Sequence, residues 1–240
     1  MYKDFLCCAV IAAGGSGSRF GEKNIPKQFL PLKGRPVIAW AAGLIQNCSY
    51  VDFAVMVMRR DLLARWDEIT ALYGFDKFTS ISGGDCRQAS VLSGLRRAEE
   101  VADGRKALCI VHDGARPLSS PGFLEETIKA AFDHGAALCA VPSRDTIKEA
   151  RPPDMAFVSK TPNRTAMYAA QTPQVFHLDL LIKAHETAIA DGFTGYDDAC
   201  LVERLGGDVR IIPGSNTNIK ITFPEDIALA EALMKFYNQA

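Results

Sequence analysis

Continuous apolar runs alternate with segments of helical periodicity through the first 142 residues, and this alternation limits the fold more than any other feature. Uninterrupted apolar runs are typical of strands buried on both faces of a parallel sheet. These runs are Phe5–Ala13, Val51–Met58, Ala107–His112 and Ala136–Pro142, with Lys77–Ser82 as a shorter, more polar candidate. The amphipathic segments between them are Pro36–Asn47, Asp61–Tyr73, Arg87–Ala102 and Pro121–Phe132. Together they predict right-handed βαβ units in an α/β fold, with a mostly parallel sheet flanked by helices.

The alternation stops after Pro142. Residues 143–174 are rich in proline and show no sustained helical period, and they are too many for an ordinary connection. Met155–Ser159 and Ala166–Ala170 have β-compatible composition, which favours a short hairpin arm over the alternative of a surface loop.

The strand and helix pattern resumes at His177. The expected helices are Leu178–Ala190, Asp197–Leu205 and Pro224–Phe236, and the expected strands are Val209–Pro213 and Asn218–Thr222. No internal repeat and no second core is visible. We therefore expect one domain over residues 1–240, from which residues 143–174 protrude.

The charge balance excludes several classes of partner. Lys and Arg number 27 against 28 Asp and Glu, so the net charge of −1 argues against a binder of nucleic acid or anionic membranes. Affinity for phosphate must then come from a few placed cations. No stretch approaches the ~20 apolar residues of a membrane span, and the run Leu6–Ala13 is too short for a signal-peptide core.

The cysteines indicate a reducing compartment. All seven are scattered, with no C-x-x-C pair and no spacing typical of zinc ligands. A reduced, cytoplasmic protein is therefore expected.

A glycine-rich segment, AAGGSGSRFGEKNIPKQFLPL (residues 12–32), follows the first expected strand. Its glycines let backbone N–H groups approach a phosphate. The dinucleotide signature fails, because Gly21 is out of place and Met58-Arg59-Arg60 supplies no acid for a ribose, and the Walker pattern is absent. These failures disfavour a nicotinamide-dependent oxidoreductase.

The same segment carries Arg19, Lys23 and Lys27. Arg19 and Lys27 could straddle a triphosphate, as cationic clamps do in phosphoryl transfer. The alternative is a solvated basic loop. Glycines at the carboxyl edge of a strand favour binding, since open α/β sheets bind ligands there.

The motif VHDGARPL (residues 111–118) ends another expected strand and places Asp113 near Arg116. This pairs a metal- or hydroxyl-binding carboxylate with a phosphate-binding guanidinium. Alternatively, Asp113 caps the helix that begins at Pro121, or pairs with Arg116 alone.

Two further motifs are less specific. SGGDCRQAS (residues 82–90) is a second Gly–Gly turn that opens a helix, although Asp85 could simply cap that helix. In NIKIT (residues 218–222), Lys220 lies within an expected strand, where an interior lysine needs an anion. Its side chain could point into the site or to solvent.

Seven motifs occur in order along almost the whole chain: AAG…SRFG…PKQFLPL, GGDxRxxS, VHDGARP, DTIK, AQTPQ, DDACLVE and NIKITFPED. In these motifs the sequence resembles the 2-C-methyl-D-erythritol 4-phosphate cytidylyltransferases of the non-mevalonate isoprenoid pathway. The resemblance implies a Rossmann-like nucleotidyltransferase fold, a homodimer and a Mg²⁺-dependent transfer of CMP from CTP to a sugar-alcohol phosphate. The sequence departs from the family in one extra residue between AAG and Arg19, and in Phe20 where Met is usual.

The resemblance also implies roles for individual residues. The catalytic cations, which hold the triphosphate and stabilise charge at the α-phosphorus, would be Arg19, Lys27 and Lys220. The nucleotide would be bound by Ala12, Ala13, Gly14, Gly15, Ser16, Gly84, Asp85, Ser90, Asp113 and Gly114, with Gly84, Asp85 and Ser90 on the cytosine. The acceptor would be bound by Asp113, Arg116, Thr146, Arg164 and Thr172, and the metal by Asp113. In the family the arm crosses to the other subunit, so Arg164 and Thr172 would bind the acceptor phosphate in trans.

The expected reaction is attack of the acceptor's monophosphate on the α-phosphorus of Mg·CTP, with release of pyrophosphate and formation of 4-diphosphocytidyl-2-C-methyl-D-erythritol. A phosphate dianion is already a nucleophile, so no general base is required. Ribitol-5-phosphate cytidylyltransferases share nearly all these motifs and often carry Val in place of Ala115, so ribitol phosphate remains an alternative acceptor. A non-catalytic nucleotide-binding homologue is a further alternative, which the retained cations and Asp113 disfavour.

Overall fold

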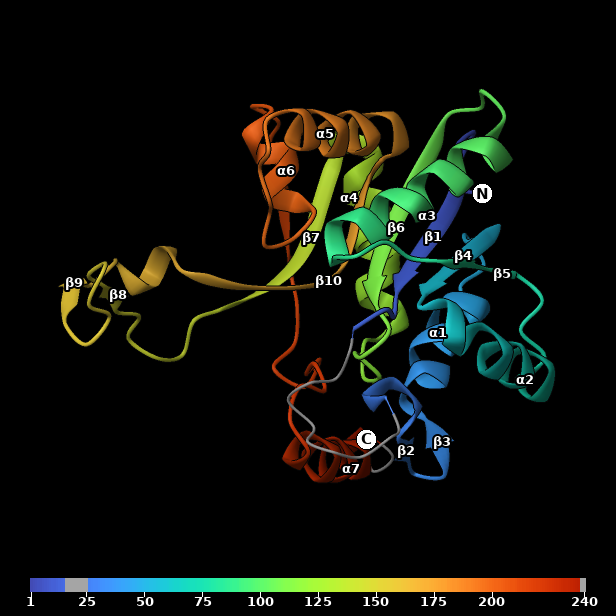
Figure 1. Cartoon of the computed structure of the whole chain (residues 1–240), viewed down its shortest axis with the longest axis horizontal. Helices are drawn as coiled ribbons and strands as arrows, with labels where there is room; N and C mark the ends of the chain where they lie inside the picture. The colour runs from blue at the N-terminus through green and yellow to red at the C-terminus, as the bar shows by residue number, and fades with distance from the viewer. Residues whose placement is uncertain (16–25, 238–240) are drawn as a thin grey trace.

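The computed structural model describes residues 1–15 and 26–237 (Figure 1). Within these residues, seven strands form one central sheet in the order β11-β7-β10-β6-β1-β4-β5. The strands are β1 (Leu6–Ala12), β4 (Phe53–Met58), β5 (Phe78–Ser82), β6 (Ala107–Asp113), β7 (Ala136–Pro142), β10 (Tyr168–His177) and β11 (Arg210–Pro213). Only β10 runs antiparallel to its neighbours, β6 and β7. The prediction of a mostly parallel sheet is confirmed.

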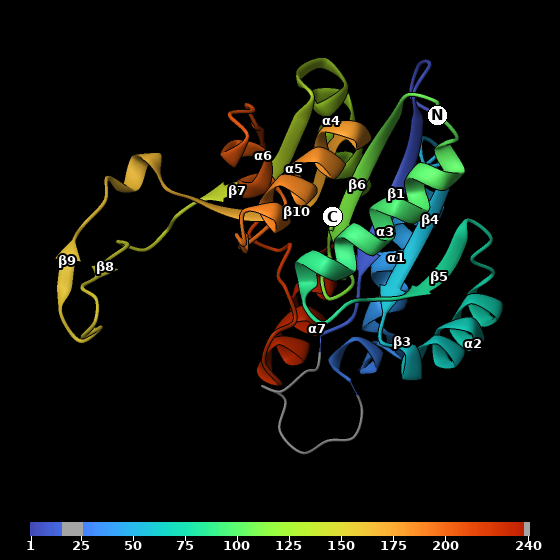
Figure 2. The same ribbon diagram turned by 45° about the horizontal axis from the view of Figure 1, so that its top comes forward.

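Helices lie on both faces of this sheet, as Figures 1 and 2 show. They are α1 (Val37–Asn47), α2 (Leu63–Tyr73), α3 (Arg87–Ala102), α4 (Pro121–His134), α5 (Leu178–Ala190) and α6 (Ala199–Arg204). The last helix, α7 (Glu225–Tyr237), lies beyond the sheet, near β2 (Pro31–Leu32), as Figure 1 shows. The single 3₁₀ turns are η2 (Lys27–Phe29), η3 (Arg60–Leu62) and η4 (Arg164–Ala166). Each predicted helix is confirmed, with ends that shift by a few residues. In the part of the chain described, no helix has the length and apolar character needed to span a membrane.

The two faces of the sheet explain why its strands are continuously apolar. In β1, Cys7, Ala9 and Ile11 pack toward α1, α2 and α4, whereas Cys8 and Val10 pack toward α3, α5 and α6. Successive side chains of a strand point to opposite faces, so a strand covered on both sides must be apolar at every position.

A third, smaller cluster joins the C-terminal part of the chain to the sheet. Leu32 of β2 (Pro31–Leu32) and Ala230 of α7 pack around Leu118 and Ile221. The strand β2 pairs only with β3 (Arg35–Pro36). This cluster holds the C-terminal segment over the loop that follows β6.

One predicted strand, Asn218–Thr222, is wrong: the segment is not part of any sheet. It crosses the loop after β6 instead of running beside a strand, and its Ile221 amide donates to the carbonyl oxygen of Ala115 (2.8 Å). The alternation of Ile219 and Ile221 therefore reflects packing against that loop and α7.

The arm projects from the body of the molecule (Figure 1) and contains a two-stranded hairpin. The hairpin pairs β8 (Glu149–Ala150) with β9 (Val158–Lys160). The predicted partner segment Ala166–Ala170 is not in this hairpin, which corrects the expected pairing. Tyr168–Ala170 instead pairs with the end of β7, where β10 begins. The protruding part therefore ends before residue 174, because β10 is drawn into the gap between β6 and β7.

Candidate functional site

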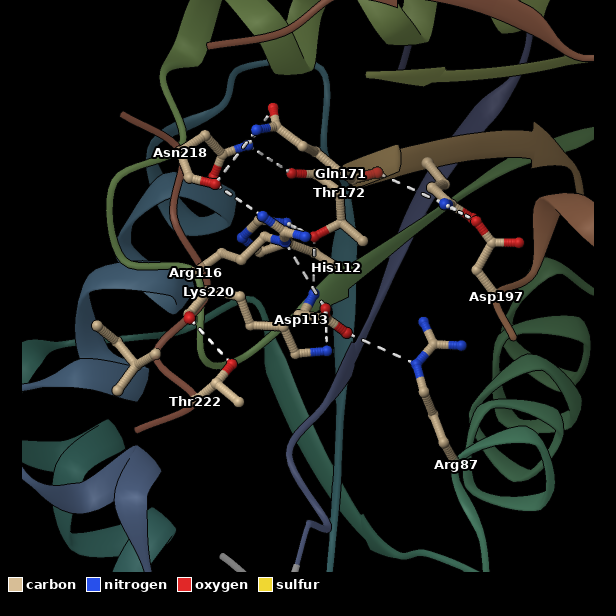
Figure 3. A network of polar contacts seen from close by, with 12 residues as sticks. Arg87, His112, Asp113, Arg116, Gln171, Thr172, Asp197, Asn218, Lys220 and Thr222 are labelled. Atoms are coloured by element: carbon tan, nitrogen blue, oxygen red, sulfur yellow. Dashed lines mark hydrogen bonds and ion pairs between the residues drawn. The ribbon is translucent and has the colours of Figure 1, made fainter. Parts of the chain in front are cut away.

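Asp113 is the last residue of β6, and three cations surround its carboxylate (Figure 3). Lys220 Nζ lies 2.7 Å from Oδ2 and Arg116 Nε lies 3.7 Å from the same oxygen. Arg87 Nε lies 3.6 Å from Oδ1. Burial by itself raises the pKa of Asp113, but the charges of Lys220, Arg87 and Arg116 hold it well below its usual range. The carboxylate is therefore ionised at neutral pH.

Lys220 reaches Asp113 because the segment around it is fixed by backbone contacts. Arg116 Nη1 donates to the carbonyl oxygen of Asn218 (2.7 Å), and the Ile221 amide is bound to the loop after β6. Lys27, from η2, donates through Nζ to the carbonyl oxygen of Ile221 (2.7 Å). Lys27 thus binds the segment that carries Lys220, and Lys220 directs its ammonium group to Asp113.

Asp113 does not cap the following helix. The N-cap of α4 is Ser120, whose hydroxyl accepts from the Phe123 amide at 3.4 Å. Asp113 does pair with Arg116, but not with Arg116 alone, because Arg87 and Lys220 contact the same carboxylate. The arrangement is a cationic cluster around one carboxylate.

Thr172 lies beside Asp113 within the same chain. Its Oγ1 accepts from the Asp113 amide (3.1 Å) and lies 2.9 Å from His112 Nδ1. The Thr172 hydroxyl proton is then available to Nδ1. His112 is fully buried, and burial lowers its pKa to about 4, so the ring is neutral at pH 7. The expectation that Thr172 lies on the crossing arm is wrong, because β10 brings it into the central sheet.

Two buried amide side chains that the sequence analysis did not single out hold this region together. Asn218 Nδ2 donates to the carbonyl oxygen of Thr172 (3.0 Å). Gln171 Nε2 donates to the carbonyl oxygen of Ser215 (2.7 Å). Both amides are almost fully buried and tie the segment of Lys220 to β10. Gln171 lies in the AQTPQ motif and Asn218 in the NIKIT motif, but neither motif indicates what these two residues contact.

A second group of predicted residues gathers where β1 and β5 end and α3 begins. Ser90 is buried and donates through Oγ to the carbonyl oxygens of Cys86 (2.8 Å) and Gly84 (3.2 Å). A Cβ on Gly14 would lie 3.8 Å from that Oγ. The N-cap of α3 is Cys86, so Asp85 is not the cap and its side chain is exposed. The predicted cytosine-reading residues are thus close together.

Three other predicted nucleotide contacts have backbone groups that are already hydrogen-bonded within the protein. The Ala13 amide donates to Val57 (2.8 Å), and the Gly114 amide donates to Ala12 (3.1 Å). Gln28 Nε2 donates to the carbonyl oxygen of Ala13 (2.7 Å). These residues form the floor where β1 and β6 end. A Cβ at Gly114 would lie 3.2 Å from that of Ala13, so the floor is tightly packed.

Two of the predicted acceptor-binding residues are not brought to this cluster. Thr146 and Arg164 are exposed on the arm, where Arg164 Nη1 contacts the carbonyl oxygen of Arg144 at 3.4 Å. The arm projects away from Asp113 (Figure 1). Ser16 and Arg19 lie outside the described residues. Gly15 is exposed at the end of the described part of that loop.

The cluster has a buried extension, formed by Arg87, Asp198 and His185, that was not predicted from the sequence. Arg87 Nη2 lies 2.7 Å from Asp198 Oδ2, and His185 Nε2 lies 3.1 Å from Asp198 Oδ1. Arg87 and Asp198 belong to the GGDxRxxS and DDACLVE motifs, so their positions were visible although their contacts were not. His185, on the buried face of α5, had no such signal.

The donor set bears on which metal could bind. Among residues 1–15 and 26–237, no group of three or more His, Cys, Asp or Glu is placed to hold a metal ion. Mg²⁺ is commonly held by one or two carboxylates together with substrate phosphates and water. Asp113, ionised and at the edge of the sheet, fits that chemistry and not that of a site built from protein ligands alone.

Comparison with known proteins gives one consistent result. The sequence profile described as 2-C-methyl-D-erythritol 4-phosphate cytidylyltransferase matches residues 7–236. Proteins of that name from Geotalea uraniireducens and Geobacter metallireducens are 39% and 41% identical to the chain, over 96% and 95% of its length and 97% of theirs. The solved structure of 4-diphosphocytidyl-2C-methyl-D-erythritol synthase from Anaerococcus prevotii is 30% identical, with a TM-score of 0.84 over 97% of both chains. The Thermus thermophilus cytidylyltransferase structure is 29% identical, with a TM-score of 0.73 over 96% of this chain and all of that one.

Proposed function

Because the chain belongs to the 2-C-methyl-D-erythritol 4-phosphate cytidylyltransferase family, we propose that it transfers CMP from CTP to 2-C-methyl-D-erythritol 4-phosphate. The products are pyrophosphate and 4-diphosphocytidyl-2-C-methyl-D-erythritol. The observation that carries the assignment to this site is the contact of Lys220 with the ionised Asp113, on a segment whose Ile221 carbonyl oxygen Lys27 binds.

The chemistry requires charge neutralisation more than proton transfer. A phosphate oxygen of the acceptor forms a bond to the α-phosphorus, and the bond from that phosphorus to the oxygen of the β-phosphate breaks. Both reactants are polyanions, so their approach is opposed by repulsion. Lys27 and Lys220 supply fixed positive charge where negative charge develops. Arg19 is the third cation of this proposal.

Asp113 and its neighbours would orient the reactants. The carboxylate of Asp113 would hold the metal and contact ribose or acceptor hydroxyls, and Arg116 would lie on the acceptor side. When bound, Mg²⁺ lowers the repulsion between the phosphate groups. Thr172 fixes the backbone of Asp113 from within the same chain.

The nucleotide would lie over the ends of β1, β4 and β5. Ala12, Ala13, Gly14, Gly15, Ser16 and Gly114 would line its site. The cytosine amine needs a hydrogen-bond acceptor, and Gly84, Asp85 and Ser90 offer oxygen atoms at the start of α3. Cytosine is then selected by hydrogen bonds to its edge.

We also propose a homodimer in which the arm completes the site of the partner subunit. Arg164 would bind the acceptor phosphate, with Thr146 nearby. The arm exposes Met155, Phe157 and Val158, which is apolar area that a partner could cover. The protein would act as a single domain in the cytoplasm, consistent with seven free cysteines.

A pyrophosphate-release assay tests the function. With CTP and Mg²⁺, methylerythritol 4-phosphate should support turnover, ribitol 5-phosphate should support little, and EDTA should abolish the reaction. Preference for ribitol 5-phosphate would transfer the assignment to the related enzyme class. Turnover of neither acceptor would reject the proposal.

A further inference from the structure

Arg87 lies between two carboxylates but contacts them unequally. From the first turn of α3, its Nη2 is 2.7 Å from Asp198 Oδ2, which is hydrogen-bond distance. Its Nε is 3.6 Å from Asp113 Oδ1, an ion pair without a direct hydrogen bond. Arg87 is therefore anchored on Asp198. It faces Asp113, as Figure 3 shows.

The anchor is itself fixed. Asp198 is 1% exposed, and its second oxygen, Oδ1, accepts from Nε2 of the fully buried His185 (3.1 Å). Gln174 binds the residues on either side: its Nε2 donates to the Asp197 side chain at Oδ2 (2.8 Å), and its Oε1 accepts from the Ala199 amide (3.2 Å). With both of its oxygens engaged, Asp198 cannot turn without breaking a buried contact.

This anchoring divides the two oxygens of Asp113 between opposite sides. Oδ1 faces Arg87, and Oδ2 faces Lys220 at 2.7 Å. Without Arg87, the carboxylate is free to turn both oxygens toward Lys220 and Arg116. A buried carboxylate that loses one cation pairs more closely with those that remain. Lys220, which is 2.7 Å from Oδ2 with Arg87 in place, would then be held by both oxygens of Asp113 and would be released less readily to the phosphates.

We propose that Arg87, anchored by Asp198 and His185, is a positioning residue that holds Asp113 and so keeps Lys220 available to the reacting phosphates. The inference rests on the proposed function of Lys220 and Asp113. It adds a buried support that extends from α5 through α6 and α3 to the end of β6.

Two single variants and their combination test this support. Arg87→Met removes the charge at similar length, and Asp198→Asn weakens the anchor at almost the same shape. Each should lower kcat about 10- to 100-fold, the usual effect of removing an outer partner of a site, and leave the KM for CTP unchanged. The double variant should lose no more than Arg87→Met alone, because the two residues act through one contact.

A matched control comes from the same helix. Arg97 pairs with Glu100 on the surface of α3 (2.9 Å), so Arg97→Met should keep the wild-type kcat. Chemical unfolding of each variant shows that it is folded at the assay temperature. Should Arg87→Met fail to fold, Arg87→Lys carries the test, since lysine keeps the charge but cannot face both carboxylates. It should show the same fall in kcat.

Three results would overturn the inference: wild-type kcat in a folded Asp198→Asn variant, losses that multiply in the double variant, or a raised KM for CTP with unchanged kcat. The last result would place Arg87 with the cytosine-reading turn. Wild-type protein that releases no pyrophosphate would instead count against the proposed function itself.

Discussion

The Asp113 cluster and the arm are opposite solutions to placing a functional side chain. At the cluster, residues distant in sequence are fixed by buried contacts within one chain, as Thr172 and Asn218 show. On the arm, Arg164 is exposed, and its guanidinium lies 3.4 Å from the carbonyl oxygen of Arg144. The arm also exposes Phe157, which is 58% accessible, whereas β1 is buried from Leu6 to Ile11.

This difference concerns what holds the side chains of each region in place. The cluster is ordered by folding, because its polar groups find their partners inside one chain. The arm pairs β8 with β9 but leaves Arg164, Met155 and Phe157 exposed to solvent. In the proposed dimer, the residues around Asp113 come from one folded chain, and Arg164 of the arm comes from the partner subunit through assembly.

The largest effect should follow from removing a cation of the cluster. Lys220→Ala and Lys27→Ala should each lower kcat by about 10²- to 10³-fold, the usual result of losing one group that stabilises transition-state charge. The fold should survive, because Lys220 is 41% exposed. Steady-state pyrophosphate release measures the loss, and Lys129→Ala, on the surface of α4, is the control. Near-normal turnover in both variants would remove the cluster from the reaction.

The second prediction tests through pH how far the cluster depends on a buried neutral histidine. The pKa of His112 is lowered to about 4 by burial, against about 6.5 in an unfolded chain. A depressed pKa contributes stability above the unfolded value, and that contribution is lost as the pH falls from about 6.5 to about 4. The loss should approach about 3 kcal/mol of unfolding free energy.

Urea unfolding in EDTA at pH 7, 5.5 and 4.5 would measure this slope. His112→Gln should flatten it, and His134→Gln, at an exposed position at the end of α4, should not. An equal slope in wild type and His112→Gln would show that the buried histidine does not set the acid sensitivity of the cluster.

The smallest predicted effect tests whether the arm works in trans. Arg164→Ala should weaken turnover about 10- to 100-fold, the value of a hydrogen bond to a charged group. Mixing it with Lys220→Ala after joint unfolding and refolding should restore activity. Half of the dimers are then mixed and one of their two sites is intact, so about a quarter of wild-type activity should return. Strict absence of recovery would mean that Arg164 does not serve the partner's site.

Much of the fold follows from local pattern. The double-sided burial of β1 made its apolar run continuous, and the strands and helices up to residue 142 could be predicted from such runs. The segment Asn218–Thr222 was wrongly predicted as a strand, because alternating isoleucines can pack against a loop and a helix as well as against a sheet. Thr172 was wrongly assigned to the arm, because the proline-rich sequence around it gives no clear signal for the start of β10.

The site could be predicted in part for a similar reason. Asp113 and Lys27 follow strand ends and glycines, which are local signals, and Lys220 belongs to a motif. Arg87 belongs to a motif that the sequence shows, but its ion pair with Asp198 joins residues 111 positions apart. Nothing short-range encodes such a pair. His185 lies on an apolar helix face, where a histidine gives no sign of a buried acid beside it.

The antiparallel strand β10 has a consequence for how such a chain can change in evolution. Its first residues pair with the end of β7 where the arm begins, and its fifth residue, Thr172, binds the Asp113 amide. One residue inserted into β10 would turn Thr172 to the opposite face. A residue inserted between β8 and β9 would only lengthen an exposed turn. The turn between β8 and β9 contains no residue of the Asp113 cluster, so the contacts around Asp113 do not fix its length, whereas the length of β10 is fixed by the contact of Thr172 with Asp113.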